Sequence, residues 1–415
     1  MQNPLPSPLN GLPPSSGVPP SLLRGVRVLD LTSSIAAPYA TMLLADYGAE
    51  VIKVERPGTG DDSRAWGPPF LQGESLMYLS VNRNKMSVAL DFTSDEGFAI
   101  LHQLARCCDV VVVNMTPRVL KKLRVDYESF KAIQPEIIYV SITGFGLTGK
   151  RADMSCYDLI AEGYSGVMDV TGEADSPPQK IGTPAADLLA GMDAVIATIS
   201  ALFDRGRTGK GHLIDVSLVE SMTRFLTPRI VPYLGSGEVP RRTGAKDSAI
   251  AIYQSFETAD LPITLGLGNE GLWKRFWVAV GDPEFGADPR FGNNADRHRH
   301  RPEIVARIAS LLAKQRRSHW LELLAKANIP AGPINRVDQV AADQELISRG
   351  LFYTMQRDAL QIPQVGLGVG VDGERPAPRT PPPRLGEHSD QVLRQLCNLD
   401  ADAVRNLRER GVVGP

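Results

Sequence analysis

The 415-residue sequence contains little cysteine. Its four cysteines are Cys107, Cys108, Cys156 and Cys397; two are adjacent, and no pair has the Cys-x-x-Cys spacing of a metal or redox motif. A disulfide framework and a cysteine-bound metal centre are therefore excluded as organising features of the fold. Sparse, unpatterned cysteine is typical of a reducing compartment, and we expect a cytoplasmic protein.

The sequence also lacks an excess of charge of one sign and any long hydrophobic run. The 45 Lys and Arg residues nearly balance the 47 Asp and Glu residues, for a formal net charge of -2. No global attraction to nucleic acid or to an anionic membrane follows, so local clusters must hold any anionic ligand. No stretch approaches the roughly 18 uninterrupted apolar residues of a membrane span. We expect neither nucleic acid nor a membrane as a partner.

Several nucleotide-binding and hydrolase motifs are missing. The segment 29–38, where a dinucleotide fold carries Gly-x-Gly-x-x-Gly, contains no glycine, and no nicotinamide cofactor is expected. The segment 206–211 departs from the P-loop pattern, and no Gly-x-Ser-x-Gly elbow occurs. His298 and His300 have no Cys or carboxylate cluster at ligand spacing, so we expect an exposed polar turn and no metal.

What the sequence does contain is an alternation of β-branched runs and helical patterns from residue 26 onward. The predicted strands are 26–31, 51–54, 87–90, 110–113 and 137–142. The predicted helices are 37–47, 94–107, 188–203, 217–233 and 302–325. The continuous run Val110–Val113 suits a strand covered on both faces, as in a parallel sheet wrapped by helices. The sequence therefore predicts an α/β fold with a doubly wound, Rossmann-like sheet.

Basic residues and glycines gather near the ends of these strands. The basic residues are Lys53, Arg56, Arg83, Lys85, Arg118, Lys121, Lys122 and Arg124. Ligands of α/β sheets bind at one such edge, but most Lys and Arg residues are simply solvated, so we expect about two of these eight to touch a ligand. The loops 143–149 and 265–269 are rich in glycine, which allows close backbone approach and offers N–H groups to developing negative charge. Ordinary turns are the alternative.

Asp187 is a lone carboxylate near the start of the apolar segment 185–192. A carboxylate in apolar surroundings is costly unless it is paired, and such acids recur at sites of nucleophilic or proton-transfer chemistry. Asp is also common in the first turn of helices, where free N–H groups and the helix dipole favour it. Position alone leaves both readings open.

The ordered motifs of the chain resemble those of the class III CoA-transferases, also called the CaiB/BaiF family. This family includes formyl-CoA transferase, carnitine CoA-transferase and 2-methylacyl-CoA racemase. The matching segments are 23–31, 45–57, 82–85, 141–146, 157–159, 165–168, 171–172, 187–188, 208–211, 332–335 and 385–388. The resemblance runs from about residue 23 to residue 413, and the motifs are specific as an ordered set.

The resemblance implies an intertwined homodimer of interlocked rings. Each subunit would have a large Rossmann-like domain built from both chain ends and a smaller α+β domain in the middle. We accordingly divide the chain into a disordered Pro- and Ser-rich leader (1–21), the N-terminal part of the large CoA-binding domain (22–205), linker helices (206–235), the small domain (236–335), and a return linker with the C-terminal part of the large domain (336–415).

The resemblance also assigns the chemistry. Asp187 aligns with the catalytic aspartate of the transferases, which carries the acyl group as a mixed anhydride and then CoA as a thioester. An acyl-CoA thioester and a free carboxylic acid are the substrates. The CoA contacts that carry over are Ala36, Arg56, Leu76, Met77, Tyr78, Leu79, Asn114, Met115, Lys122, Thr143, Gly144 and Phe145. Lys122, Thr143 and Phe145 depart from formyl-CoA transferase, which has arginine, lysine and tyrosine there. Gly266, Gly268 and Asn269 align with a flexible loop over the active site.

Two alternatives are weighed against the transferase. The racemase branch uses a His and the aspartate for proton transfer, supported by a Glu, and here Tyr157 and Asn269 occupy the His and Glu positions. Asp187 would then lack an acid/base partner. A non-catalytic CoA-binding subunit of a two-chain enzyme is the other alternative, and it would be expected to have lost Asp187.

Two segments, 61–70 and 78–85, look most like the branch of succinate/hydroxymethylglutarate and mesaconate CoA-transferases. We therefore expect a dicarboxylate acceptor, with succinyl-CoA as a donor. Arg241 or Arg242 is the candidate for binding the distal carboxylate.

Overall fold

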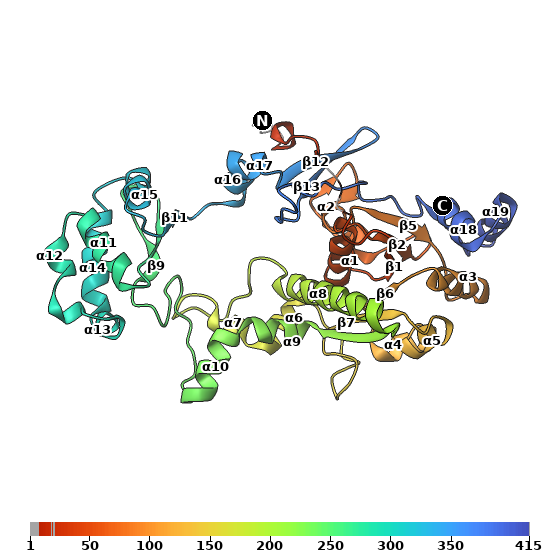
Figure 1. The fold of residues 1–415 in the computed structure, drawn as a ribbon, viewed down its shortest axis with the longest axis horizontal. Coiled ribbons are helices and arrows are strands. Elements are labelled where there is room, and N and C mark those ends of the chain that lie inside the picture. Colours follow the sequence, from red (N-terminus) through yellow and green to blue (C-terminus); the bar gives the residue numbers. More distant parts are fainter. Residues whose placement is uncertain (1–7, 18, 20, 415) are drawn as a thin grey trace. The chain divides into compact units, whose positions relative to one another are not determined.

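The computed structural model describes residues 8–17, 19 and 21–414, and the chain divides into two compact units (Figure 1). Unit 1 comprises residues 1–167, 181–231 and 341–415, and unit 2 comprises residues 168–180 and 232–340. Each unit is built from segments far apart in the sequence. Residues 1–7, 18 and 20 of the predicted leader lie outside the described residues.

A six-stranded parallel sheet forms the centre of unit 1, in the order β5-β2-β1-β6-β7-β8. Its strands are β1 (Arg27–Leu31), β2 (Glu50–Glu55), β5 (Lys85–Ala89), β6 (Val110–Val113), β7 (Ile138–Thr143) and β8 (His212–Ser217). This order reverses direction between β1 and β6, as in Rossmann-like sheets. The predicted doubly wound sheet is confirmed, and all four residues of Val110–Val113 are buried.

The sixth strand, β8, was not predicted. The expected helix over 217–233 is wrong at its start, because Ser217 ends β8 and also caps the helix that follows. That stretch contains α9 (Leu218–Phe225) and α10 (Thr227–Ser236). Strand β8 alternates half-buried and exposed positions along its outer part, which is the weaker pattern of an edge strand.

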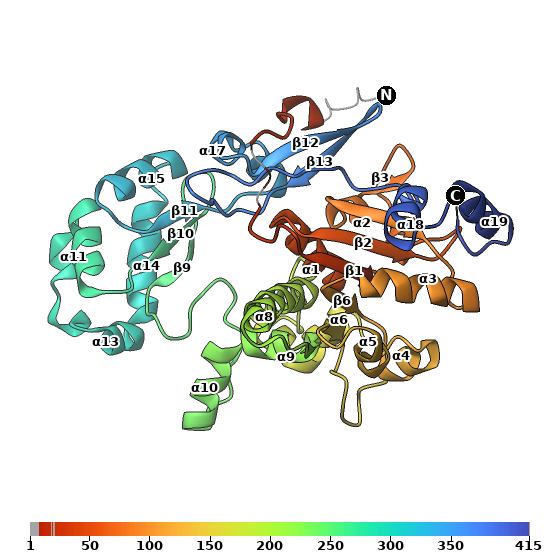
Figure 2. The same cartoon turned by 45° about the vertical axis from the view of Figure 1, so that its right-hand side comes forward.

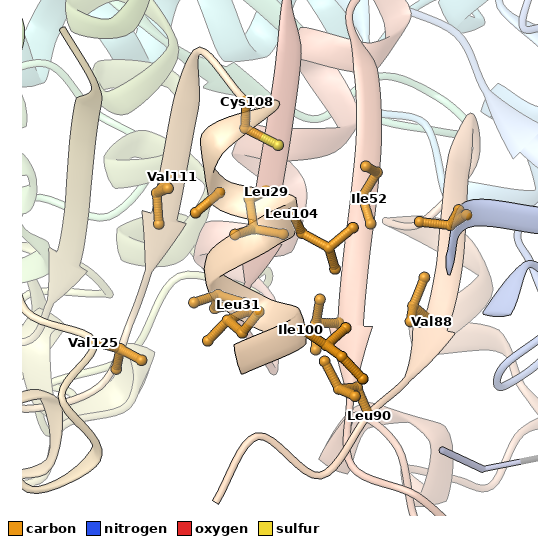
Figure 3. Close-up of a cluster of buried hydrophobic side chains, with 14 of the residues drawn as sticks. Leu29, Leu31, Ile52, Val88, Leu90, Ile100, Leu104, Cys108, Val111 and Val125 are labelled. Carbon is orange, nitrogen blue, oxygen red and sulfur yellow. The ribbon is translucent and has the colours of Figure 1, made fainter. Parts of the chain in front are cut away.

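Helices cover both faces of the sheet (Figure 2). On one face, α3 (Asp95–Arg106) packs Ile100 and Leu104 against Leu29 and Leu31 of β1 (Figure 3). The same cluster includes residues of α4 (Pro117–Leu123), α5 (Tyr127–Ile133), α18 (Ser389–Cys397) and α19 (Ala401–Glu409). On the other face lie α1 (Ala36–Asp46) and α8 (Ala185–Thr208). Side chains alternate between the two faces because successive residues of a strand point in opposite directions.

The chain start and the return segment pair with each other. Strands β12 (Phe352–Arg357) and β13 (Leu360–Val365) form an antiparallel hairpin, which was not predicted. Pro14 forms a parallel bridge with Thr354, whose N–H donates to the Pro13 carbonyl while the Thr354 carbonyl accepts from Ser15 N–H. The expected disorder of the leader is therefore wrong for residues 13–15, because composition does not reveal a pairing partner about 340 residues away.

Unit 2 packs an antiparallel sheet against helices. Its strands, in the order β11-β10-β9, are β9 (Tyr253–Phe256), β10 (Ile263–Gly266) and β11 (Ala331–Pro333). The helices α11 (Glu270–Ala279), α14 (Arg301–Leu312) and α15 (Arg317–Lys326) supply Trp273, Phe276, Ile308 and Trp320 to one apolar core, and the short helix α13 (Asn294–Arg299) precedes α14. The single helix predicted over 302–325 is two helices, with a break at residues 313–316.

Candidate active site

The carboxyl ends of the central strands enclose a cavity of about 270 Å³ at the point where the strand order reverses. Its walls come from the segments after β1, β2, β5 and β6. The lining residues are Leu31, Thr32, Ser33, Val54, Glu55, Arg56, Gly60, Asp61, Asp62, Leu90, Asp91, Phe92, Thr93, Asn114, Met115 and Leu123. Ligands of open α/β sheets bind at this position. A larger hollow of about 770 Å³ near α18, lined by residues such as Asp390 and Asp400, contains no such convergence of strand ends.

Asp187 lies in the first turn of α8. Its side chain is partly buried, and burial raises the pKa of this carboxyl to about 7, with a further contribution from the negative charge of Asp158. A carboxylate that is poorly hydrated and lies near a second carboxylate is less stable as an anion and therefore a better base and nucleophile. The structure gives Asp187 the properties of a reactive acid.

Asp158 is the closest acidic partner of this turn, and the sequence did not identify its role. It is the first residue of α6 (Asp158–Ser165), and its Oδ1 accepts the Ala186 N–H at 2.8 Å. The Asp187 N–H points to the same oxygen at 3.5 Å. Asp158 therefore caps the start of α8 from another helix. Its position in the family motif 157–159 was a signal in the sequence, but the sequence could not show that its side chain meets the start of α8.

The start of α8 packs against the start of α1. A Cβ on Gly191, one turn after Asp187, would lie 2.8 Å from the Ala36 carbonyl oxygen and 3.0 Å from the Tyr39 ring. Glycine is needed at this position because the two helices approach so closely. Since α1 begins just after the carboxyl end of β1, this contact places Asp187 at the same edge of the sheet as the cavity.

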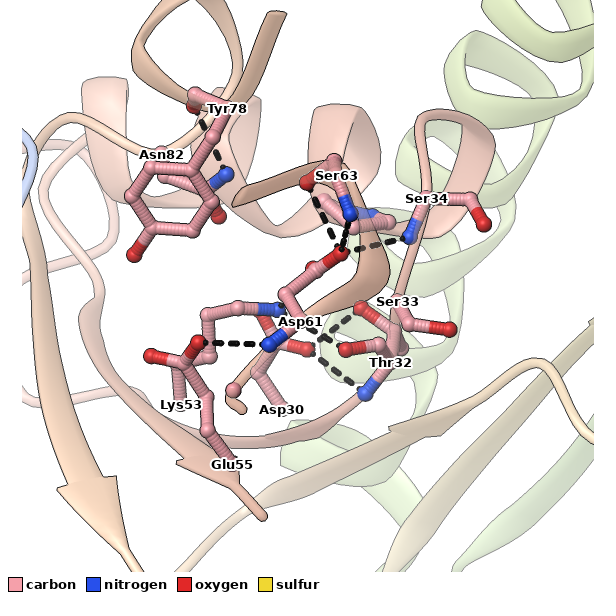
Figure 4. A network of polar contacts seen from close by, with 12 residues as sticks. Asp30, Thr32, Ser33, Ser34, Lys53, Glu55, Asp61, Ser63, Tyr78 and Asn82 are labelled. Carbon is pink, nitrogen blue, oxygen red and sulfur yellow. Dashed lines mark hydrogen bonds and ion pairs between the residues drawn. The ribbon is translucent and has the colours of Figure 1, made fainter. Parts of the chain in front are cut away.

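A buried polar network lies beneath this edge (Figure 4). Lys53 Nζ pairs with Asp61 at 2.8 Å, and Lys85 Nζ pairs with Asp30 at 3.1 Å, all four side chains being inaccessible to solvent. Burial alone would raise the pKa of Asp30, but the Lys53 and Lys85 charges and the hydroxyls of Thr32 and Thr41 outweigh it and lower that pKa to about 2. Burial lowers the pKa of Lys85 to about 8 in spite of Asp30.

A model of CoA-transferase family III matches residues 23–389 of this chain. The chain belongs to this family. The catalytic class expected from the sequence motifs is thereby confirmed, and the enzyme is a class III CoA-transferase.

Known CoA-transferases align with nearly the whole length of this transferase. It is 38% identical to the mouse (Mus musculus) succinyl-CoA:glutarate CoA-transferase over 392 residues, which cover 94% of this chain and 90% of the mouse protein. It is 38% identical to the Agrobacterium fabrum succinate–glutarate CoA-transferase over 388 residues, covering 92% and 97% of the two chains. Against the Haloarcula hispanica succinyl-CoA:mesaconate CoA-transferase it is 34% identical, with coverages of 89% and 95%. The predicted branch of the family is confirmed.

A solved structure has the same fold as the transferase. The crystal structure of a CaiB/BaiF family protein from Brucella suis superposes with a TM-score of 0.79 at 37% identity. The alignment covers 92% of this chain and all of that chain.

The structure brings some of the predicted CoA contacts of the transferase to the cavity. Arg56, Asn114 and Met115 line it. Lys122 is exposed on helix α4 and precedes Leu123, which also lines the cavity. Ala36 begins α1 next to the start of α8. Asn114, however, uses its amide on the backbone of Ser33, accepting from Ser33 N–H at 3.2 Å and donating to the Ser33 carbonyl at 2.7 Å.

The predicted contacts over Leu76–Leu79 are divided. Tyr78 and Leu79 are buried in a cluster with Leu360 and Ile362, and the Tyr78 hydroxyl accepts a hydrogen bond from Arg64. Neither of these two side chains offers surface to a ligand in this structure. Met77 is 39% exposed and Leu76 is partly buried, so they alone keep the predicted role.

In the loop after β7, two backbone N–H groups form hydrogen bonds with side chains of the protein. Gly146 N–H donates to the Thr143 hydroxyl at 2.9 Å, and Leu147 N–H donates to the Asp215 carboxylate at 2.9 Å. Gly144 packs against Cys156, and a Cβ there would lie 2.1 Å from the Cys156 Cβ. Phe145 makes an edge contact with the Tyr164 ring. The N–H groups of Gly146 and Leu147 are therefore bonded internally in this structure, as in the alternative of an ordinary turn.

Three of the eight predicted basic residues are internal ion-pair partners. Lys53 and Lys85 belong to the network described above, and Arg83 pairs with Asp46 at 2.5 Å in the interior. Basic residues that the sequence placed near strand ends, where a ligand could bind, are thus buried and paired with acids from other parts of the sequence. Arg56 stays exposed at the cavity and pairs with Asp62.

In unit 2, the predicted glycine loop connects β10 to α11. Gly266 N–H donates to the Pro330 carbonyl and Leu267 N–H to the Ile252 carbonyl. Among the hydrogen bonds of the described residues, none uses the N–H of Gly268 or of Asn269. The Asn269 side chain accepts from Leu272 N–H at 2.9 Å and caps α11. Tyr157, in unit 1, is 66% exposed.

The arginines proposed for the distal carboxylate differ in their surroundings. Arg242 donates to the Asp169 carbonyl and carboxylate at 2.8 and 2.9 Å, within unit 2. Arg241 is exposed and has no described ion-pair partner.

Two searches of the described residues concern metals and membranes. Residues 8–17, 19 and 21–414 contain no group of three or more His, Cys, Asp or Glu side chains arranged to hold a metal ion. One helix in this part of the chain, α8, is long and apolar enough to cross a membrane by length and composition, a test that buried core helices also pass. Seven residues of α8, including Ala190 and Ala194, are buried.

Proposed function

We propose that the transferase moves CoA from an acyl-CoA, with succinyl-CoA as a donor, to a dicarboxylic acid through covalent intermediates on Asp187. The observation that carries this proposal is the partly buried Asp187 carboxyl, with its pKa raised to about 7, at the ligand-binding edge of the sheet. Near neutral pH such a group is partly ionised and more nucleophilic than an ordinary carboxylate.

In the proposed first half-reaction, a carboxylate oxygen of Asp187 attacks the thioester carbonyl carbon. The C–S bond breaks, CoA leaves as a thiolate, and a mixed anhydride remains on Asp187. The thiolate then attacks the Asp187 carbonyl carbon, which releases the donor acid as a carboxylate and leaves an aspartyl-CoA thioester.

The second half-reaction reverses these steps with the acceptor. A carboxylate oxygen of the acceptor attacks the aspartyl thioester and forms a new anhydride, releasing CoA thiolate. The thiolate attacks the acceptor's acyl carbon, and the Asp187 carboxylate is regenerated. No net proton is consumed, so a group with a pKa near 7 needs only to be ionised at the start of each cycle.

Asp158 supports this chemistry in the proposal. By accepting the Ala186 N–H it fixes the first turn of α8, and its charge raises the pKa of Asp187. Within unit 2, the N–H groups of Gly268 and Asn269 take part in no hydrogen bond among those of the described residues, which leaves them able to donate to an oxyanion. Bound acyl-CoA would use Arg56 and Met115 at the cavity together with Lys122.

The dicarboxylate part of the proposal is supported by the relatives, which are named for glutarate and mesaconate. Arg241 is the candidate for the distal carboxylate, because Arg242 already pairs with Asp169. The transferase would work as a homodimer in the cytoplasm, as predicted from the sequence.

Mass spectrometry tests the proposal directly. The protein is mixed with succinyl-CoA and quenched with hydroxylamine, which converts an activated carboxyl to a hydroxamate. We expect the hydroxamate at Asp187, and we expect the Asp187→Ala variant to lose CoA exchange by several orders of magnitude. Modification of another residue, or exchange that Asp187→Ala leaves intact, would contradict the mechanism.

A panel of acceptors tests the substrate class. Glutarate, succinate and mesaconate are compared with acetate and butyrate in the same assay, with and without an Arg241→Gln substitution. We expect dicarboxylates to be preferred and Arg241→Gln to raise their KM by about tenfold or more, since a charged hydrogen bond is lost. Exchange with monocarboxylates alone would refute the dicarboxylate assignment while leaving the transferase chemistry in place.

A further inference from the structure

The loop of residues 32–34, which joins β1 to α1, has no regular hydrogen bonding of its own. Five of the six backbone N–H and C=O groups of these three residues are bonded to side chains from elsewhere. Thr32 N–H donates to Asp30 at 3.0 Å, and the Thr32 carbonyl accepts from Lys53 Nζ at 2.8 Å. The Asn114 side-chain amide accepts from Ser33 N–H and donates to the Ser33 carbonyl. Ser34 N–H donates to Asp61 at 3.0 Å.

The conformation that these bonds hold is strained. Ser34 has φ of 73°, in the left-handed region that residues other than glycine rarely adopt. Such a backbone persists only when its surroundings enforce it, and residues of this kind cluster at active sites and ligand-binding sites. Thr32 and Ser33 line the 270 Å³ cavity, so the loop forms a wall of the proposed CoA pocket.

Asp61 is the centre of this arrangement. Its Oδ1 accepts from Ser34 N–H, from Ser63 N–H at 2.8 Å and from the Ser63 hydroxyl at 2.7 Å, while its Oδ2 faces Lys53 Nζ at 2.8 Å (Figure 4). Lys53 in turn holds the Thr32 carbonyl. One buried ion pair therefore fixes both ends of the three-residue loop.

Stability alone does not explain this pair. Moving two charges out of water costs about as much free energy as their attraction returns, and apolar residues of the same size are often equally stable in such positions. The pair also holds both ends of one loop, through the Thr32 carbonyl and the Ser34 N–H, and this is better explained by the geometry that it imposes on that loop.

We propose that Asp61, together with Lys53, is a positioning residue that holds residues 32–34 in the shape needed to bind the CoA moiety. The proposal rests on the proposed function, since it assumes that the cavity receives CoA. Asp61 is 3% exposed and acts through the loop, so it contributes to binding and not to the chemical step at Asp187.

The test is a double variant that removes both charges, Lys53→Met with Asp61→Asn, because Asp61→Asn alone leaves a buried unpaired lysine and can fail to fold. Calorimetry measures the Kd for CoA, and kinetics measure KM and kcat for succinyl-CoA. We expect Kd and KM to rise about 10- to 100-fold, as for a misplaced binding group, while kcat at saturating succinyl-CoA changes less than threefold.

A matched control separates positioning from loss of stability. Arg83 and Asp46 form another buried pair, with Asp46 at the opposite end of α1 from this loop. The variant Arg83→Met with Asp46→Asn removes two buried charges in the same way, and we expect it to lower the thermal midpoint but leave the Kd for CoA unchanged.

The outcomes are distinguishable. If the wild-type protein binds CoA and the Lys53→Met, Asp61→Asn variant binds it equally well, the positioning role is refuted while the transferase proposal stands. If both double variants weaken binding in proportion to their lost thermal stability, the effect is structural and the positioning role is again refuted. A wild-type protein that binds no CoA would overturn the proposed function and this inference together.

Discussion

At the scale of single residues, the proposed chemistry depends on two aspartates that the chain separates by 29 positions. Asp187 could be predicted as the nucleophile from the sequence, because it is the one acid at the start of an apolar segment and aligns with the family's catalytic residue. Asp158 could not, because its role depends on where α6 meets α8. Short motifs reveal residue types, whereas the environment that sets a pKa is built by the fold.

Replacing Asp158 by Asn tests this coupling. Asn keeps an oxygen that can accept the Ala186 N–H, but it removes the negative charge. The pKa of Asp187 should fall from about 7 and remain above its ordinary range, because burial is the larger cause. The rate of hydroxamate formation at Asp187 should therefore begin to rise at lower pH, with a several-fold gain near pH 6. A pH profile that does not move would contradict the coupling.

The raised pKa of Asp187 also predicts a dependence of stability on pH. An acid whose pKa is higher in the folded state than in the unfolded state opposes folding as it ionises, so stability is lost as pH rises from about 4 to about 7. Asp187→Asn should therefore stabilise the protein by about 1–3 kcal/mol at pH 8, after allowance for partial exposure, and by little near pH 4. Thermal unfolding across this pH range measures the effect. An equal gain at both pH values would show that the charge is not the cause.

At the scale of elements, α8 has two faces of different character. One face, with Ala190, Ala194 and Thr198, is buried within the subunit. The opposite stripe of Met192, Ile196, Ile199 and Phe203 is 38–70% exposed. Helix α10 has no buried residue at all. Exposed apolar stripes of this kind are typical of protein interfaces, and we expect a second copy of the chain, in the homodimer predicted from the family, to cover this one.

A charge on this stripe should disrupt the dimer. Ile196 is 63% exposed, so Ile196→Glu has no cost within one subunit but places an unpaired carboxylate in the proposed interface. We expect light scattering to show a shift from dimer toward monomer. The matched control is Lys314→Glu, at an exposed position of unit 2 after α14, which should leave the mass unchanged. A dimer that persists in Ile196→Glu at low concentration would show that α8 is not in the interface.

At the scale of the whole molecule, the large unit is assembled from both ends of the chain. Val392 and Leu393 of α18, and Val404 and Leu407 of α19, belong to the same core cluster as Leu29 and Val88. The last residues of the chain are thus part of the central core, packed against strands formed more than 300 residues earlier.

Substitutions at two adjacent residues of α18, one buried and one exposed, measure how much this C-terminal helix contributes to the free energy of unfolding. Leu393 is 0% exposed whereas Arg394 is exposed. Leu393→Ala should reduce the free energy of unfolding of unit 1 by about 2–5 kcal/mol, and Arg394→Ala by less than about 0.5 kcal/mol. Urea denaturation compares the two variants. Equal effects would mean that α18 does not share the core of the central sheet.

The sequence by itself determined the doubly wound sheet, the family and the candidate nucleophile. Strand periodicity, the apolar run Val110–Val113 and the position of Asp187 are local properties, and local properties are readable from the chain. The tertiary structure alone decided which strand-end charges are internal, which glycine N–H groups are free, and how residues 32–34 are held. Those outcomes depend on contacts such as Asp158 with Ala186 and Asp61 with Ser34, which join segments that no sequence pattern relates to each other.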